Sequence, residues 1–303
     1  MEAILGLAPD SPSLTELGGI VWPIDTTTIP RAFNPAIARD ASGQLAVVAR
    51  VSNYSLDAKH GTVTIPSGDR SVTNTTYFSF LDSNLMPIKW QKLSFSEEPK
   101  LSRGVEDARL LLRGEEWFIS AVMLETHTPR ARVSIYSLDS NLQASHVKTY
   151  EGKMPLRPEK NWMTKLESNL NDFDFVSELP GDLRGGSSLI LWDGGYLALC
   201  HKTYIKKNKY YNPRTFGTHE GSERTYIHAF VEFSLDLAVK AVSKEFFLVS
   251  RGIEFGTGLL QLEDDLLLSF GRNDKESWFG RISKLKVKKL LKEGKQYVNN
   301  TSN

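Results

Sequence analysis

The chain alternates short apolar runs with clusters of Gly, Asp, Asn and Ser along most of its length. The apolar runs are rich in Val, Ile, Leu, Phe and Tyr, which is typical of β-strands joined by tight turns. Helical periodicity is nearly absent. Runs of this kind cover 45–51, 117–123, 196–201 and 266–271, each after an acidic or glycine-containing turn. The pattern predicts an all-β fold assembled from hairpins.

Five segments of the chain follow one plan, in which a small or polar cluster opens a strand, a turn follows and a second apolar strand runs back. The clusters lie near residues 34, 106, 160, 185 and 255. This repeat is typical of the blades of a β-propeller, whose innermost strands start at a central channel. We therefore expect a five-bladed β-propeller that forms a single domain over residues 1–303. Because the third and fourth clusters are close in sequence, we expect the third blade to be reduced.

The tail of the chain differs from the rest. Leu285, Leu290 and Leu291 stand among lysines between residues 283 and 295, which predicts a short C-terminal helix. An amphipathic helix packed on a blade is favoured over a role in binding nucleic acid or membrane.

The composition of the chain limits the classes of binding partner that we expect. Lys and Arg number 37 against 36 for Asp and Glu, so the net charge of +1 gives the whole chain no attraction to nucleic acid or anionic membranes. The chain has no run of roughly eighteen apolar residues, and its first residues lack the pattern of a signal peptide. We expect a soluble, cytoplasmic protein with no membrane partner. The single cysteine, Cys200, cannot form an internal disulfide, and we expect it to be buried in a strand.

Polar residues gather in the clusters that open the predicted blades. Because these openings converge at one end of a propeller's channel, residues far apart in sequence can form one pocket there. Unpaired charges are costly inside a protein, so their presence needs a reason. They either form a ring of ion pairs that holds the blades together, or line a functional site, or do both. The residues are Asn34, Glu106, Asp107, Arg109, Lys160, Asn161, Arg184 and Glu254.

The adjacent acids Glu106 and Asp107 carry the main candidate chemistry. Strand alternation points neighbouring side chains to opposite sides, so we expect at most one of the two to face the channel. A carboxylate among cations can give or take a proton when a glycosyl group is transferred to or from a hydroxyl.

The segment 201–224 is a predicted long hairpin that mixes basic and aromatic residues. His201, Lys202, Tyr204 and Arg224 are its candidate binding residues. This mixture suits sugar stacking, a nucleotide diphosphate or a nucleic-acid backbone, although a solvated surface loop accounts for it as well. The histidines lack the spacing of a zinc site, and we expect no metal and no cofactor.

The ordered set of motifs resembles glycoside hydrolase family 130, the β-mannoside phosphorylases and hydrolases, with their β-1,2-mannosyltransferase relatives. Residues 104–109 resemble that family's Gly-Val-Glu-Asp-Pro-Arg motif, whose Asp is the catalytic acid, which implies this role for Asp107. The resemblance also implies a five-bladed propeller. Further segments of the family are similar to residues 34–36, 49–51, 160–161 and 185–186 and to His201 of this chain. Together with the 201–224 segment, the predicted substrate-binding residues are Asn34, Arg50, Glu106, Arg109, Lys160, Asn161, Arg184, His201, Lys202, Tyr204, Arg224 and Glu254.

Departures from the family's pattern bear on the reaction. Ala108 replaces the motif's proline, 187–188 are serines where the family has prolines, and the phosphate-binding arginines have no match between residues 160 and 180. We therefore favour an inverting glycosyltransferase that uses an activated donor, either a nucleotide sugar or a sugar phosphate, and a hydroxyl acceptor. A β-mannoside phosphorylase or hydrolase and a non-catalytic propeller that binds carbohydrate or a partner remain alternatives. The acceptor is a small molecule, a glycan or a nucleic acid.

Overall fold

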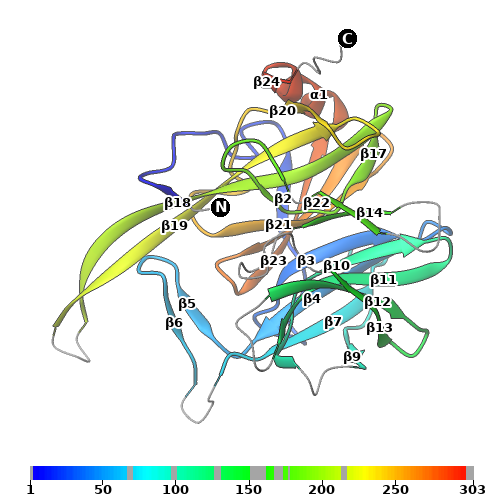
Figure 1. The fold of residues 1–303 in the computed structure, drawn as a ribbon, viewed down its shortest axis with the longest axis horizontal. Coiled ribbons are helices and arrows are strands. Elements are labelled where there is room, and N and C mark those ends of the chain that lie inside the picture. The colour runs from blue at the N-terminus through cyan, green and yellow to red at the C-terminus, as the bar shows by residue number, and fades with distance from the viewer. Residues whose placement is uncertain are drawn as a thin grey trace.

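The computed structural model describes residues 3–66, 71–96, 101–125, 131–150, 162–166, 173–176, 178–212 and 217–297. Strands dominate these residues, and a short helix near the C-terminus is the one helix among them (Figure 1). The expected all-β fold with a short C-terminal helix is confirmed. None of the described residues forms a helix with the length and apolar character that crossing a lipid bilayer requires.

The strands fall into separate sheets that follow the order of the predicted repeats. The first sheet contains β3 (Phe33–Arg39), β4 (Leu45–Ser52), β7 (Asn74–Phe80) and β8 (Gln91–Lys92). The second contains β10 (Leu101–Arg113), β11 (Glu116–Glu125), β12 (Ala131–Leu138), β13 (Gln143–Tyr150) and β9 (Ser94–Phe95). The third contains β14 (Met163–Leu166) and β15 (Phe173–Val176). The predicted opening near residue 160 lies outside the described residues.

The fourth and fifth sheets also include strands from near the two ends of the chain. The fourth contains β16 (Arg184–Gly185), β17 (Ile190–Trp192), β18 (Gly195–Asn212), β19 (Gly217–Phe233), β20 (Val239–Val242), β24 (Lys295–Gln296) and β1 (Ile4–Leu5). The fifth contains β21 (Glu254–Gln261), β22 (Asp265–Arg272), β23 (Glu276–Ser283) and the N-terminal β2 (Ile20–Pro23). A small hairpin, β5 (Ser55–Asp57) and β6 (Thr62–Thr64), is inserted between β4 and β7.

The first strands of three sheets carry a β-bulge near the opening end. In β3, β10 and β21 one extra residue interrupts the pairing with the second strand. Asn34 and Asp107 lie at the bulges of β3 and β10 and adopt left-handed backbone conformations, with φ of 51° and 49°. Asn and Asp are the non-glycine residues that tolerate this conformation best. A bulge turns a side chain away from the regular alternation of the strand, and here it redirects both polar groups.

The first strands also contact one another across the sheets. The amide of Asn34 on β3 donates a hydrogen bond to the carboxylate of Asp107 on β10. The hydroxyl of Thr257 on β21 donates to the carbonyl of Pro35 on β3, at 2.5 Å. Figure 1 shows β3, β10 and β21 close together at the centre of the molecule.

The fourth sheet joins the same centre through Gly186, which follows β16. Nε of Arg109 on β10 donates to the carbonyl of Gly186 at 2.6 Å. A Cβ atom at Gly186 would lie only 2.5 Å from the carbonyl oxygen of Gly256 on β21, so only glycine permits this close approach. The opening ends of four first strands are thereby gathered in one region.

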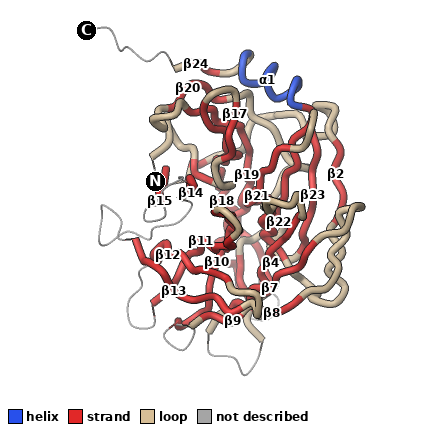
Figure 2. Tube along the Cα trace, turned by 90° about the vertical axis from the view of Figure 1, so that its right-hand side faces the viewer, coloured by secondary structure: helices blue, strands red, loops and turns tan. Residues whose placement is uncertain are grey.

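Helix α1 (Lys284–Lys292) begins after Ser283, whose hydroxyl accepts a hydrogen bond from the backbone N–H of Lys286. Three apolar side chains of the helix are buried in the core shared by the fourth and fifth sheets, whereas Leu285 is 80% exposed. The buried residues are Val287, Leu290 and Leu291. The predicted helix therefore covers one end of the sheets, as Figure 2 shows.

Candidate functional site

A cavity of about 380 Å³ lies where the opening ends of the first strands meet. Its lining comes from the first, second, fourth and fifth sheets and from the β5–β6 hairpin. The fold thus brings together predicted residues that lie as far apart in the sequence as Asn34 and Arg224. The predicted site residues that line the cavity are Asn34, Arg50, Glu106, Asp107, Arg184, His201 and Arg224.

Asp107 is held on two sides within the cavity. One of its carboxylate oxygens, Oδ1, accepts a hydrogen bond of 2.9 Å from the amide of Asn34. The same oxygen lies 3.5 Å from Nη1 of Arg50. The side chain of Asp107 is 13% exposed, so it remains reachable from the cavity while its orientation is fixed.

Arg50 supplies the positive charge next to both acids. Its Nη1 lies 3.8 Å from the carboxylate of Glu106, and its guanidinium stacks on the ring of Phe33 at 4.4 Å. Burial lowers the pKa of Arg50, but the charges of Asp107 and Glu106 outweigh it and raise the pKa above its usual value. The guanidinium therefore stays charged and faces two carboxylates at once.

Glu106 lines the cavity as well, so the expectation that at most one of the two adjacent acids faces the channel is wrong. The bulge at Asp107 is the physical reason, because its left-handed backbone interrupts the alternation of the strand. Glu106 accepts a hydrogen bond of 3.4 Å from the amide of Asn74, and the hydroxyl of Ser52 donates to the carbonyl oxygen of that amide.

Two further polar residues of the cavity, Tyr54 and Asp274, are absent from the residues predicted from the sequence. The hydroxyl of Tyr54 donates to Oδ2 of Asp274 at 2.7 Å. Asp274 lies in the turn between β22 and β23 with a φ of 51°. Burial raises the pKa of its carboxyl group, and the neighbouring Arg50 opposes that shift. A repeat-by-repeat alignment of the second strands could have pointed to this turn, because β22 runs into it as β4 runs toward Tyr54.

His201 forms an aromatic wall of the cavity. Its ring stacks almost parallel on Tyr226, with centroids 5.0 Å apart, and meets the edge of Phe255 at 5.2 Å. Burial, followed by the charges of His228 and Arg184, holds the pKa of His201 well below its usual value. The imidazole is therefore neutral, and its Nδ1 has no hydrogen-bond partner among the described residues.

Arginines from the fourth sheet add positive charge to this side of the cavity. Arg184 on β16 stands directly opposite His201 in the strand pairing, and Arg224 reaches the cavity from β19. A guanidinium binds phosphate or carboxylate oxygens in a fixed, two-pronged geometry. The wall can therefore hold an anionic group.

Arg109 lies outside the lining, although the sequence predicts it as a binding residue. It is 2% exposed, and burial lowers its pKa. Its hydrogen bond to Gly186 links the second sheet to the fourth. The side chain therefore joins two sheets instead of facing a ligand. Two other predicted residues, Lys160 and Asn161, lie outside the described residues.

Lys202 and Tyr204 also lie outside the lining. They point to the opposite face of β18 from His201, because side chains alternate along a strand. Lys202 pairs with Glu245 at 2.5 Å, and Tyr204 packs against a small apolar cluster. Neither side chain is therefore placed to bind a ligand in the cavity.

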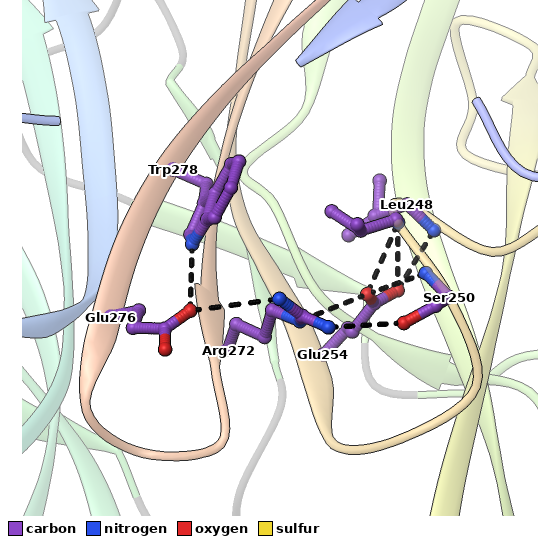
Figure 3. A network of polar contacts seen from close by, with 7 residues as sticks. Leu248, Ser250, Glu254, Arg272, Glu276 and Trp278 are labelled. Atoms are coloured by element: carbon purple, nitrogen blue, oxygen red, sulfur yellow. Dashed lines mark hydrogen bonds and ion pairs between the residues drawn. The ribbon is translucent and has the colours of Figure 1, made fainter. Parts of the chain in front are cut away.

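Glu254 is fully buried and is a further predicted residue outside the cavity lining. Its carboxylate accepts hydrogen bonds from the backbone N–H groups of Leu248, Val249 and Ser250, at 2.9, 3.1 and 3.0 Å. Arg272 lies 3.9 Å away (Figure 3). Burial raises the pKa of Glu254 to about 7, although these hydrogen bonds and Arg272 oppose the shift. In this geometry the side chain braces the turn at 248–250.

The 201–224 segment forms the expected long hairpin. β18 and β19 pair without a break from Tyr196 opposite Phe233 to Asn212 opposite Gly217. The ribbon projects beyond the body of the molecule on the left of Figure 1. Among the described residues, no group of three His, Cys, Asp or Glu side chains is arranged to hold a metal ion.

Comparisons with known proteins show which folds are similar. No protein-family model and no curated protein sequence matches the chain. The solved structure of β-1,2-mannobiose phosphorylase from Listeria innocua, in complex with β-1,2-mannobiose, has a TM-score of 0.59 at 13% identity, over 90% of this chain and 93% of that one. GDP-Man-dependent mannosyltransferase MPT-1 from Leishmania mexicana has a TM-score of 0.54 at 11% identity, over 88% and 89%.

A structure of the GH130 family of mannoside phosphorylases, described as containing glycoside hydrolases that target β-1,2 mannosidic linkages in Candida mannan, is similar too. Its TM-score is 0.57 at 12% identity, over 84% of this chain and 85% of that one. The family resemblance drawn from the motifs is therefore matched by the fold.

Proposed function

We propose that this chain is an inverting glycosyl-transferring enzyme in which Asp107 handles the proton. The observation that carries the proposal is a carboxylate fixed by an amide and a guanidinium inside a cavity of about 380 Å³, within the usual size range for small-molecule sites. The similarity of the fold to mannoside phosphorylases and to a mannosyltransferase supports it. We further propose that the five sheets are the blades of one five-bladed propeller.

The proton step follows from the position of Asp107. When a glycoside forms, the carboxylate takes the proton of the acceptor hydroxyl, and in the reverse direction the carboxylic acid returns it. Inversion needs only one displacement at the sugar carbon, so one proton-handling group on one side of the sugar suffices when the other group leaves as an anion. The amide of Asn34 and the guanidinium of Arg50 keep Asp107 oriented.

We favour an activated donor, a nucleotide sugar or a sugar phosphate, with a hydroxyl acceptor. Arg184 and Arg224 bring guanidinium groups to the cavity beside the neutral His201, and these groups suit a leaving phosphate. A leaving phosphate needs no protonation by the enzyme, which fits the assignment of Asp107 as the base. The similar structure from Leishmania mexicana is a GDP-Man-dependent mannosyltransferase.

A second candidate is cleavage of a β-mannoside by phosphate or water. The same arginines could hold inorganic phosphate as the attacking group, and the similar structure from Listeria innocua is a phosphorylase. In that direction Asp107 acts as the acid that protonates the leaving hydroxyl. The chemistry of the site is shared, and the co-substrate separates the two candidates.

The test is a product analysis with wild-type protein and two matched variants. The chain is incubated with nucleotide sugars, sugar phosphates and β-mannosides, each with hydroxyl acceptors, which include glycans and DNA, or with inorganic phosphate. We expect Asp107→Asn to lower turnover by about 10²- to 10⁴-fold, because general acid–base catalysis contributes that much. Asp264→Asn, which removes the charge of an exposed turn residue, should keep full activity.

The products decide between the candidates. A new glycoside formed from an activated donor supports the transferase, sugar phosphate released from a β-mannoside supports phosphorolysis, and free sugar supports hydrolysis. Full activity of Asp107→Asn with any of these substrates would refute the role of Asp107. Sugar binding without turnover in any combination would favour a non-catalytic carbohydrate-binding protein.

A further inference from the structure

Two hairpins from different sheets meet beside the cavity. β5–β6 extends from the first sheet and the β18–β19 ribbon from the fourth, on the same side of the body in Figure 1. The backbone N–H of Ser222 donates to the carbonyl of His60 at 2.9 Å, and the amide of Asn208 donates to the carbonyl of Lys59 at 2.8 Å. The ring of His60 packs on Tyr210 with centroids 4.2 Å apart. These contacts hold the hairpins together as one wall.

The β5–β6 hairpin turns an apolar pair toward the cavity. Leu56 and Val63 are direct cross-strand partners, so both side chains leave the hairpin on the same face. Both line the cavity, and Val63 is 52% exposed. This aliphatic pair, of which Val63 is exposed and Leu56 is half-buried, offers contact area but no hydrogen bond to a ligand.

The β18–β19 ribbon supplies a charged side chain in place of apolar ones. Arg224 and Tyr226 lie two residues apart on β19, so they share a face, and both line the cavity. Arg224 is exposed and forms no ion pair with the described residues. A charged guanidinium therefore faces the same space as the apolar pair.

The remainder of the cavity has a different character. Asn34, Arg50 and Asp107 surround its polar end with hydrogen-bonding groups that suit sugar hydroxyls. A ligand that satisfies all three regions needs a sugar, an anionic group and a flat apolar group in one molecule. A free phosphate would leave the apolar pair unused, and an oligosaccharide would leave both Arg224 and the apolar pair without suitable partners.

We propose that the β5–β6 hairpin and the β18–β19 ribbon bind the nucleoside diphosphate portion of the sugar donor. The base lies on Leu56 and Val63, and the diphosphate is held by Arg224. This inference rests on the proposed glycosyl-transfer function and names its donor class together with the residues that select it. Neither Leu56 nor Val63 belongs to a motif that the sequence pattern singles out.

The test measures equilibrium binding of GDP, UDP and inorganic pyrophosphate, by calorimetry, to the full chain and three variants. Arg224→Ala should weaken the binding of GDP, UDP and pyrophosphate by about 10- to 100-fold, because it removes charge-assisted hydrogen bonds. Val63→Thr, which keeps the shape but replaces a methyl group with a hydroxyl, should weaken only the binding of the nucleotides, by about fourfold. Lys207→Ala is the matched control, since it removes an exposed positive charge of the same ribbon outside the cavity lining.

The pattern across the three ligands decides the outcome. Weakening of GDP and UDP by both Arg224→Ala and Val63→Thr, with pyrophosphate sensitive to Arg224→Ala alone, supports the inference. Equal effects of Arg224→Ala and Lys207→Ala would show general electrostatic attraction and overturn it. Absence of nucleotide binding by a folded wild-type chain would overturn it as well.

The binding test is independent of the catalytic test. If Asp107→Asn still binds nucleotides with the expected pattern while the wild type transfers no sugar, the nucleotide site stands and the proposed function fails. If the wild type transfers sugar from a sugar phosphate and binds no nucleotide, the function stands and this inference fails.

Discussion

Asp107 and Glu254 are acids at the opening ends of first strands, yet their surroundings differ. Asp107 is held by the side chains of Asn34 and Arg50 and is reachable from the cavity. Glu254 is fully buried and accepts hydrogen bonds from backbone N–H groups of one turn. Asp107 lies inside the bulge of β10, whereas Glu254 lies ahead of the bulge of β21, in regular pairing with Arg272. Asp107 therefore lines the cavity, whereas Glu254 holds a turn of the backbone.

The comparison also separates two ways in which a buried carboxylate is tolerated. Backbone N–H groups cannot move away when a ligand arrives, so the hydrogen bonds of Glu254 are suited to stability. Asn34 and Arg50 hold Asp107 through side chains, and Arg50 is shared with Glu106. Asp107 therefore stays at the surface of the cavity with the charged guanidinium of Arg50 beside it.

The largest expected effect is a loss of stability when the side chain of Glu254 is removed. Glu254→Ala leaves three backbone N–H groups and Arg272 without a buried acceptor, which should lower the free energy of unfolding by about 3 to 5 kcal/mol. Asp107→Asn should change it by less than about 1 kcal/mol, because the asparagine keeps an oxygen that can accept from Asn34 and Arg50 keeps Glu106 as an ion-pair partner. Urea denaturation followed by tryptophan fluorescence measures both values.

Glu276 provides the control within the same network. Its carboxylate accepts a hydrogen bond from Trp278 and lies 3.8 Å from Arg272, but it is 37% exposed (Figure 3). Glu276→Ala should cost about 1 kcal/mol or less, because exposed ion pairs contribute little. Equal losses for Glu254→Ala and Glu276→Ala would mean that the turn at 248–250 does not depend on Glu254.

The next effect is a dependence of stability on pH. Burial raises the pKa of Glu254 from 4.5 to about 7, so between these values the folded chain binds more protons than the unfolded chain. The contribution of this group to stability is then fully present below pH 4.5 and falls as the pH rises to 7, by about 3 kcal/mol. The free energy of unfolding at pH 4.5, 5.5 and 7, measured for wild type and Glu254→Gln, tests the sign.

The variant isolates Glu254 from other groups that titrate in this window. Asp274 also has a raised pKa and contributes in the same direction in both proteins. The difference in slope between wild type and Glu254→Gln therefore belongs to Glu254. Parallel curves for the two proteins would contradict the raised pKa.

Much of this arrangement follows from sequence patterns. The alternation of apolar runs and turns predicted the all-β fold. The opening clusters near residues 34, 106, 185 and 255 predicted four segments that meet at the cavity, whereas the cluster near residue 160 lies outside the described residues. Strand alternation could also have predicted that Lys202 and Tyr204 face away from His201, because odd and even positions of β18 lie on opposite faces of the sheet.

Other features depend on geometry that no local pattern contains. The bulge at Asp107 turns both Glu106 and Asp107 into the cavity, and a shift of one residue in pairing is invisible in composition. The hydrogen bond between Tyr54 and Asp274 joins residues that are 220 positions apart. Glu254 resembled its counterparts in the other repeats, and only the path of the turn at 248–250 assigns it to the backbone.

The smallest expected effect concerns Asn34, the residue whose amide distinguishes the surroundings of Asp107 from those of Glu254. Asn34→Gly removes the amide that donates to Asp107 but accepts the left-handed φ of 51°, whereas Asn34→Ala removes the same amide and strains the backbone by about 1 kcal/mol. Both variants should lower kcat by about 10-fold, the equivalent of one hydrogen bond to a charged group. Their free energies of unfolding should differ, with Ala the less stable. If kcat follows stability instead, so that Asn34→Gly keeps wild-type turnover, then the backbone conformation rather than the amide orients Asp107.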